Sequence, residues 1–484
     1  MLAKDLNLRL KPGFERRKVT VTVELVTPQF GGGAESRKPD AEQWLRPASV
    51  RGALRFWWRA LFGASFQSLK DMHGAETAIF GGAAAGNARG QAGKVAVVVQ
   101  PLNKAQLLSW ADRQQRDVDR VKQEQKAFRP VIASAQSVAY FPANENKKER
   151  LAAAELVSPS VRAELTIYDL SAFGPQEHQL SDTQWKQLLE ALRGFILFGG
   201  SGSRTRRGAG AICLSSPHDA QILDMPMTPD ALKRWISQYT KPGQEHDCFL
   251  LSRCQAIYIT PEYDHGEQAQ ETLLQMWREF RQQRRHPKSW FGRDKWGRTS
   301  WPEADAVRLI ANQYASWENG GQPIRHQPNL LNKGRAPRAH LGLPIIVKFK
   351  DDAGARQTEE AQGTFRRGRW LDTEPPASEI VAMKNGPDGT QQPVDRYASP
   401  VLLSVTSVVV PGQPNHLRFV GLVLITRSIL KTNQAVCLKG RGDQVLHPGE
   451  WVDVVDSERE PRGLRQLLAQ FKFQPILTIE GSTK

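Results

Sequence analysis

The chain has 484 residues, enough for two or three domains and at least one large hydrophobic core. Its 66 Lys and Arg residues outnumber 50 Asp and Glu residues, which gives a net charge of +16. This surplus suits a polyanionic partner such as nucleic acid, although an inert basic surface would have the same composition. Four cysteines and the lack of an apolar run of roughly 20 residues exclude a disulfide scaffold and a membrane-spanning protein. We therefore expect a cytoplasmic protein with no signal peptide and no membrane partner.

The first half of the chain predicts a strand-helix-strand-strand-helix-strand series. Its strands alternate β-branched and polar residues or are short apolar runs, and its helices repeat apolar residues every three to four positions. The predicted elements are a strand at 18–27, a helix at 47–61, strands at 94–100 and 161–168, a helix at 182–198 and a strand at 209–214. This order, with two helices on one face of an antiparallel sheet, is typical of ferredoxin-like domains, including RNA-recognition domains. We assign residues 1–220 to this domain.

Two insertions interrupt the series. Residues 81–93 are rich in Ala and Gly and predict a mobile link, and residues 103–150 predict a solvated helical excursion. In the second half, strands are predicted at 254–260, 343–350, 400–410, 417–426 and 475–479, and helices at 267–285 and 463–471. Residues 351–389 predict a long surface loop. We interpret residues 221–484 as a second, elaborated ferredoxin-like domain, so the predicted fold class is α+β, with two ferredoxin-like (RRM-like) domains carrying insertions.

The segment RPASVRGALRFWWRALFG, residues 46–63, carries three arginines on one face of the predicted helix. Arg51, Arg55 and Arg59 recur every four residues, beside an apolar arc that can pack on the sheet. Three adjacent guanidinium groups repel one another unless an anion lies across them, and guanidinium groups match phosphate geometry. The alternative is a basic face paired with Asp or Glu from elsewhere, since this helix has no acidic residue. The RNA-binding residues predicted here are Arg46, Ser49, Arg51, Arg55, Trp58 and Arg59.

A second candidate segment is the glycine- and arginine-rich loop FGGSGSRTRRGAG, residues 198–210. Its glycines permit positive φ and a close backbone approach to a ligand, so its N–H groups can cradle phosphates under the arginines. It is not a Walker loop, because no Gly-Lys-Ser/Thr follows and it comes after a helix. A plain turn is the alternative. The predicted RNA-binding residues are Gly199, Gly200, Ser201, Gly202, Ser203, Arg204, Arg206, Arg207 and Gly208, together with Gly31, Gly32 and Gly33 after the first strand.

These motifs resemble those of the RAMP superfamily of CRISPR proteins. The resemblance is carried by Gly31–Gly33, the tryptophan-rich helix of residues 46–63, IFGG at 79–82 and GGSGSRTRRGAG at 199–210. The helix resembles the first-subunit family of the Cmr module of type III-B effector complexes, as do LGLPI at 341–345 and DRYASPVLL at 395–403. The resemblance implies two ferredoxin-like domains, contact with guide RNA and target RNA, and assembly with other Cmr subunits near the guide 3′ end. In the second half the only candidate for a matching glycine-rich loop is KGRGDQ at 439–444.

Residues 277–301 interleave aromatic and basic side chains. Aromatic faces could stack on bases while cations hold phosphates, or the tryptophans could be core anchors beneath a solvated basic face. The sequence leaves both interpretations open.

The sequence evidence for catalytic or metal-binding residues is weaker than the evidence for RNA binding. Some RAMP relatives cleave RNA with a histidine or an aspartate, and His73 and Asp40 are the candidates here. His73 lacks a partner base, and Asp40 can simply cap a turn. His246, Cys248 and Cys254 do not have a standard zinc spacing, so structural thiols are expected, with no metal and no cofactor.

We therefore expect a non-catalytic RNA-binding subunit of a type III-B CRISPR (Cmr) effector complex, acting in antiviral defence. Guide–target base pairing would read sequence while the protein grips backbone and shape. The alternatives are a metal-independent RAMP endoribonuclease and a scaffold subunit that contacts proteins only.

Overall fold

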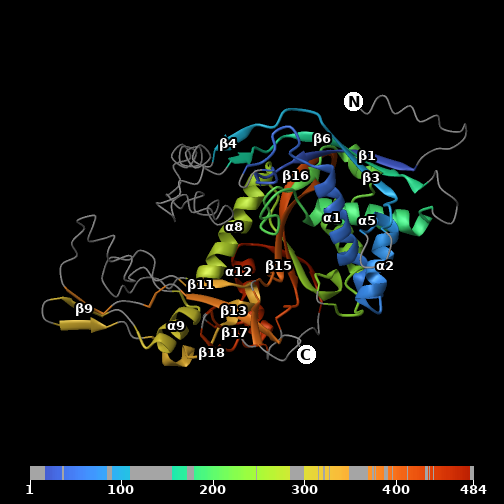
Figure 1. The fold of residues 1–484 in the computed structure, drawn as a ribbon. Coiled ribbons are helices and arrows are strands. Elements are labelled where there is room, and N and C mark those ends of the chain that lie inside the picture. Colours follow the sequence, from blue (N-terminus) through green and yellow to red (C-terminus); the bar gives the residue numbers. More distant parts are fainter. Residues whose placement is uncertain are drawn as a thin grey trace, which may run out of the picture. The chain divides into compact units, whose positions relative to one another are not determined.

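The computed structural model describes residues 17–479 except 35–37, 84–89, 110–154, 172–178, 247, 284–298, 314–315, 320–321, 326–327, 348–368, 373–374, 377, 386–390, 395, 411, 431–433, 435, 440 and 460. The chain forms two compact units, each discontinuous in sequence (Figure 1). Unit 1 contains residues 1–253, 262–271 and 403–422, and unit 2 contains the remainder. The predicted boundary between residues 220 and 221 stays a prediction. No helix in the described part of the chain is long and apolar enough to cross a membrane.

Unit 1 is built on a four-stranded antiparallel sheet with the order β3-β6-β1-β7. The central pair is in register from Lys18 opposite Tyr168 to Glu24 opposite Arg162. The valines and leucine of β1 alternate with polar residues and are buried, as the period of two requires. The strands are β1 (Lys18–Leu25), β3 (Val95–Pro101), β6 (Arg162–Asp169) and β7 (Ile212–Leu214), and a separate small sheet has the order β2-β5-β4, formed by β2 (Gln29–Phe30), β4 (Leu107–Ser109) and β5 (Glu155–Val157).

Two long helices lie side by side in unit 1 (Figure 1). Helix α1 (Pro47–Phe62) begins with proline at its first turn, and α5 (Asp182–Phe198) begins with a capping box formed by Ser181 and Gln184. Their buried faces include Leu54, Trp57 and Phe195, and the ring centroids of Trp57 and Phe198 lie 5.7 Å apart. The sequence predicted both helices, with the bounds of α5 as observed.

Helix α2 (Leu69–Phe80) was not predicted. It is capped by the Ser68 hydroxyl, which accepts from the backbone N–H of Asp71. The helix ends at Gly81, and Gly82 forms an antiparallel bridge with Gln91. The predicted mobile link thus has paired ends, while residues 84–89 within it lie outside the described residues. Two shorter helices, α6 (Pro217–Ile222) and α7 (Pro229–Ser237), follow β7.

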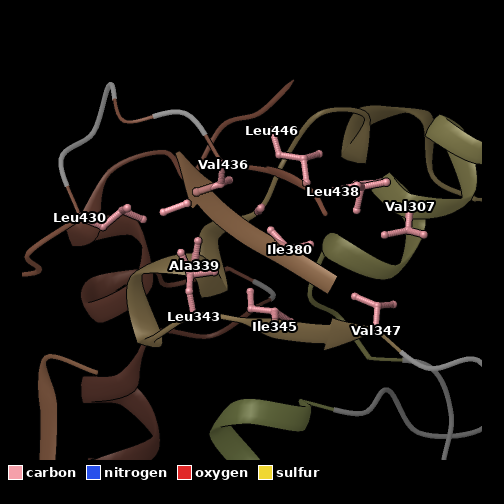
Figure 2. Close-up of a cluster of buried hydrophobic side chains, with 13 residues drawn as sticks. Val307, Ala339, Leu343, Ile345, Val347, Ile380, Leu430, Val436, Leu438 and Leu446 are labelled. Atoms are coloured by element: carbon pink, nitrogen blue, oxygen red, sulfur yellow. The ribbon is translucent and has the colours of Figure 1, made fainter. Parts of the chain in front are cut away.

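Unit 2 has its own hydrophobic core, formed around a sheet with the order β11-β13-β17-β18 and with β14 paired to β13. Figure 2 shows side chains such as Ile345, Ile380, Val436 and Leu438 gathered in this core, which Val307 of α9 also joins. The strands are β11 (Ile345–Val347), β13 (Ser378–Asn385), β14 (Gln391–Val394), β17 (Val436–Leu438) and β18 (Arg441–Leu446). Unit 2 also contains α9 (Glu303–Ala311), α11 (Trp451–Asp456) and a sheet of β9 (Ser316–Asn319), β10 (Gln322–Arg325) and β12 (Arg369–Asp372).

A further four-stranded sheet has the order β15-β16-β8-β19. In chain order its elements are β8 (Cys254–Ile259), α8 (Gly266–Gln282), β15 (Val401–Val410), β16 (Gln413–Thr426), α12 (Leu464–Gln470) and β19 (Gln474–Thr478). This is the same β-α-β-β-α-β succession as in the first sheet, and the spatial order of the four strands is also the same. The α+β fold class with two ferredoxin-like domains is therefore confirmed.

Two predicted surface segments fall partly outside the described residues. The prediction of a long surface loop at 351–389 is wrong in its second part, because Arg369–Asp372 and Ser378–Asn385 form β12 and β13. Tertiary pairing, which local composition does not reveal, orders these segments. Residues 348–368, and residues 110–154 of the predicted helical excursion, lie outside the described residues.

Candidate functional site

The two glycine-rich segments predicted to bind a ligand meet within unit 1. The backbone N–H and the side-chain hydroxyl of Ser203 both donate to the carbonyl oxygen of Phe30, at 2.7 Å and 2.8 Å. Phe30 ends β2 immediately before Gly31, so this bridge joins the Gly31–Gly33 turn to the loop after α5. These two glycine segments therefore lie together in the folded chain.

Glycine is required at the point of contact. Gly32 and Gly202 have φ of +95° and +83°, a region that other residues rarely adopt. A Cβ atom on Gly202 would lie 2.6 Å from the carbonyl oxygen of Phe30, and one on Gly32 would lie 3.6 Å from the Cα atom of Gly202. The two backbones therefore pack directly on each other.

The beginning of α1 completes this site. The Trp44 carbonyl accepts from Gln29 Nε2 at 2.9 Å and from the Ser201 hydroxyl at 3.2 Å. It thereby connects both glycine segments to the residues that lead into the helix. Sequence reasoning missed Trp44, although the Trp44–Leu45 pair just before Pro47 was a signal. An apolar residue at this position often packs against the first turn as a hydrophobic staple.

A cavity of about 410 Å³ opens where the three segments meet. It is lined by Gly32, Trp44, Leu45, Arg46, Ser49, Val50, Phe195, Gly200, Ser201, Gly202, Ser203 and Thr205. Helix α1 points its N-terminus at this cavity, with no acidic residue in the first turn and no side-chain cap from Arg46. The N–H groups of the first turn have no acceptor within the helix, so they carry a partial positive charge. This arrangement suits an anion.

Asp40 lies in the loop before α1 and acts as a turn cap. Its Oδ1 atom accepts from the backbone N–H groups of Glu42 and Gln43, each at 3.0 Å, and its Oδ2 atom lies 3.2 Å from Arg46 Nη2. The backbone donation from Gln43 is the main reason why the pKa of Asp40 lies below its usual value. The capping interpretation of Asp40 is confirmed.

The three arginines of the second glycine segment have different environments. Arg204 is exposed, in the left-handed conformation with φ of +63°. The Arg206 guanidinium lies over the Phe249 ring, 5.1 Å from its centroid, and burial lowers its pKa. Arg207 Nη1 donates to the carbonyl of Arg206 at 3.0 Å. Arg204 is thus the clear candidate for ligand contact among the three, while the structure favours a packing role for Arg206.

The arginine stripe of α1 is not a free basic face. Glu76 of α2 accepts from Arg55 Nε and from Arg59 Nη1, each at 2.6 Å, while Arg51 donates to the Phe80 carbonyl. The Glu76 side chain is only 3% exposed. The alternative interpretation holds, since a carboxylate from elsewhere in the fold neutralises the stripe. These three arginines connect α1 to α2, and we do not include them in the candidate site.

Several aromatic residues belong to the core. Trp58 is 1% exposed and its Nε1 donates to Gln187, so the prediction that it binds RNA is wrong. Trp57 and Trp58 are adjacent, so their side chains lie about 100° apart around the helix axis, and both are buried. In the region from 277 to 301, Trp277, Phe280 and Trp301 are buried, while residues 284–298 lie outside the described residues.

The candidates for catalysis and metal binding do not form a cluster. His73 is exposed on α2, His246 Nε2 lies 3.1 Å from the Phe66 carbonyl oxygen, and Cys254 is buried in β8. Burial raises the pKa of Cys254 to about 12. Among the described residues, no three His, Cys, Asp or Glu side chains are placed to hold a metal ion.

Sequence comparison with known proteins finds a match to the region that contains the candidate site. Residues 22–213, which contain both glycine segments and α1, match the sequence model described as the RAMP superfamily. This region of the chain therefore resembles a RAMP superfamily domain. The CRISPR system Cmr subunit Cmr1-2 of Pyrococcus furiosus is 29% identical over 195 residues, 39% of this chain and 91% of that protein.

Solved structures are similar to this chain only at low sequence identity. The crystal structure of Cmr1 from Pyrococcus furiosus in its apo form is 11% identical, with a TM-score of 0.44, covering 95% of this chain and 98% of that one. A chain of the type III-B Cmr-beta complex bound to cognate target RNA is 12% identical, with a TM-score of 0.43, covering 86% and 95%. At these scores the likeness adds nothing to the topology described above.

Outside the RAMP match, the two segments that resemble the Cmr family in the second half lie together in unit 2. Leu343 of LGLPI and Tyr397 of DRYASPVLL exchange two backbone hydrogen bonds, at 3.1 Å and 3.2 Å. A Cβ atom on Gly342, where φ is +111°, would lie 3.1 Å from the Tyr397 carbonyl oxygen. These motifs have a structural role in unit 2. The last four residues of KGRGDQ belong to strand β18 (Arg441–Leu446), so this segment is not a glycine-rich loop like that of unit 1.

Proposed function

We propose that the chain is a non-catalytic, RNA-binding subunit of a Cmr-type CRISPR effector complex. The observation that carries the proposal is the cavity at which two glycine segments and the N-terminus of α1 meet. Its partners would be guide RNA, target RNA and other Cmr subunits in the cytoplasm. The similarity to a Cmr subunit of Pyrococcus furiosus supports this assignment.

The chemistry of the cavity supports an RNA phosphate as the ligand. The first turn of α1 offers backbone N–H groups, and the Ser49 hydroxyl adds a donor at the same helix end. Arg46 lines the cavity, and the exposed Arg204 lies in the chain between Ser203 and Thr205, which also line it. The absence of an acidic residue from the first turn removes the group that would repel a phosphate. The site would grip backbone, and base pairing would supply sequence specificity.

The non-catalytic part of the proposal is supported by Asp40. A general base needs a pKa near the working pH, whereas the pKa of Asp40 is lowered by the N–H groups that it accepts from. Its carboxylate is committed to the turn before α1 and to Arg46. Labelled guide and target RNA should therefore stay intact on incubation with the purified chain.

The decisive experiment replaces Ser49 by Asp. Ser49 is exposed at the third position of α1, where a carboxylate interacts favourably with the helix dipole. We expect S49D to raise the free energy of unfolding by about 0.3–1 kcal/mol. The same carboxylate would repel a phosphate, so affinity for single-stranded RNA should fall at least about tenfold, a loss of about 1.4 kcal/mol.

The control is S49A, which removes the hydroxyl without adding charge. It should lower RNA affinity only about two- to threefold, since the backbone donors remain. If S49D binds fluorescently labelled RNA as tightly as the unaltered chain, phosphate does not bind at the N-terminus of α1. A flat dependence of the Kd on salt would favour the protein-only scaffold.

A further inference from the structure

An exposed pair of leucines stands out in unit 2. Leu330 and Leu331 are 74% and 80% exposed, in a 3₁₀ turn (Leu330–Asn332) that follows β10. Among the described residues the next most exposed large apolar side chain is Leu69, at 52%. We call residues 329–335 the di-leucine turn. Two adjacent leucines presented this fully to solvent are unusual on a protein surface that has no partner.

Hydrogen bonds hold the N-terminal end of the di-leucine turn in place. Asp305 Oδ2 of α9 accepts from the backbone N–H of Asn329 at 3.1 Å and from Asn332 Nδ2 at 3.0 Å. The side chain of Asn329 in turn accepts from the backbone N–H of Leu331 at 3.0 Å. These bonds fix the backbone on both sides of the leucines.

The C-terminal end of the turn is hydrogen-bonded to the segment after β18. His447 donates its backbone N–H to the Gly334 carbonyl at 2.7 Å, and its own carbonyl accepts from Ala336 at 2.9 Å. Gly334 has φ of +71°, which lets the chain leave the turn at this point. The leucines are therefore presented by a preorganised backbone, so a partner would not have to order the turn on binding.

The charges around the leucines indicate what the partner must offer. Lys333 and Arg335 are exposed beside the leucines, and no acidic residue occurs from Asn329 to Gly342. Asp305 is occupied by the hydrogen bonds that hold the turn. A complementary surface has an apolar pocket for the leucines and carboxylates at its rim. Single-stranded RNA is a poorer fit, because proteins bind its bases through aromatic faces that leucine lacks.

We infer that the di-leucine turn docks into an apolar, acid-rimmed pocket of another protein subunit. The inference rests on the proposed function only in taking that protein to be a subunit of the same effector complex. The leucines would occupy the centre of the interface, and Lys333 and Arg335 would lie at its polar edge.

The test uses the full chain and the complex purified from a host strain in which the gene for this chain is deleted. Binding of the purified chain to that complex is measured by biolayer interferometry. We expect L330S/L331S to weaken binding about a hundredfold, roughly tenfold for each leucine lost from an apolar pocket. K333E/R335E should slow association and remove its dependence on salt. The matched control L69S, at an exposed leucine of unit 1, should bind as the unaltered chain does.

The outcomes separate this inference from the proposed function. If the unaltered chain does not bind the depleted complex, the assignment to that complex fails and the inference fails with it. If L330S/L331S binds within twofold of the unaltered chain, the inference alone is overturned. Loss of RNA affinity in the isolated double variant would instead indicate an RNA wedge, and loss of self-association would indicate a second copy; either overturns it. The RNA affinity of the isolated chain should be unchanged in all three variants.

Discussion

Arg55 Nε on α1 donates to Glu76 Oε1 on α2 across 2.6 Å, and this ion pair changes the interpretation of the most conspicuous motif in the sequence. The same oxygen accepts from Arg59, so one buried carboxylate compensates two arginines that are about a third exposed. The stripe therefore holds two helices together.

Replacing Glu76 by Gln should lower stability. The amide keeps the size of the side chain but loses the charge that both arginines contact, so we expect a loss of about 1–3 kcal/mol of unfolding free energy. Urea denaturation measures it. The control E262Q, at an exposed glutamate, should change stability by less than about 0.5 kcal/mol. Equal stability of the two variants would show that the ion pairs contribute nothing.

The arginines should divide into two groups in RNA binding. R204A should weaken affinity for single-stranded RNA about three- to tenfold and reduce the slope of log K against log salt by about 0.7, the value for one phosphate contact. R55A/R59A should leave affinity within about twofold, because Glu76 already occupies both side chains. Fluorescence anisotropy at several salt concentrations makes the comparison. The reverse ranking would restore the α1 stripe as the RNA contact.

The misinterpretation of the stripe has a simple physical origin. Periodicity on one helix shows which side chains share a face, but the carboxylate that neutralises this face lies 17–21 residues later, in α2. Helix α2 is weakly amphipathic and interrupted by Gly74, so sequence pattern did not reveal it. Local signals were sufficient where they were strong. The alternation in β1 and the apolar periodicity of α1 and α5 each predicted the observed element.

The residues of the candidate site also divide into those that local sequence predicts and those that depend on tertiary contacts. The two glycine segments were recognised because positive φ and close backbone approach both require glycine, as Gly202 shows. The role of Trp44 depends on hydrogen bonds that form only in the folded chain. Arg206 could not be distinguished from Arg204 without knowing that Phe249 lies beside it.

Two glycines should respond to alanine in opposite directions. G202A places a Cβ atom 2.6 Å from a backbone oxygen at positive φ, so we expect a loss of about 2 kcal/mol or more. G52A, within α1, meets nothing within 4 Å and should stabilise the protein by about 0.5–1 kcal/mol. Thermal or urea unfolding measures both. Stabilisation by G202A would contradict the observed packing of the two glycine segments.

The contribution of Asp40 should depend on pH. Its pKa is lowered in the folded protein, so its ionised form contributes stability above the usual value of 3.8, and this contribution is lost as pH falls through the folded value. The difference in urea midpoint between D40N and the unaltered chain should therefore be constant near pH 7 and shrink below about pH 4. Neither protein should cleave labelled RNA. Cleavage that D40N abolishes would favour the endoribonuclease.

The discontinuity of unit 1 has a consequence for synthesis on the ribosome. Leu403 donates its backbone N–H to the Arg206 carbonyl, Ser404 donates to the Leu197 carbonyl, and Gln270 donates to the Gly208 carbonyl. The arginine-bearing loop thus relies on residues translated about 60 to about 200 positions later. The proposed RNA site therefore cannot be complete in a nascent chain until residues 403–422 have left the exit tunnel.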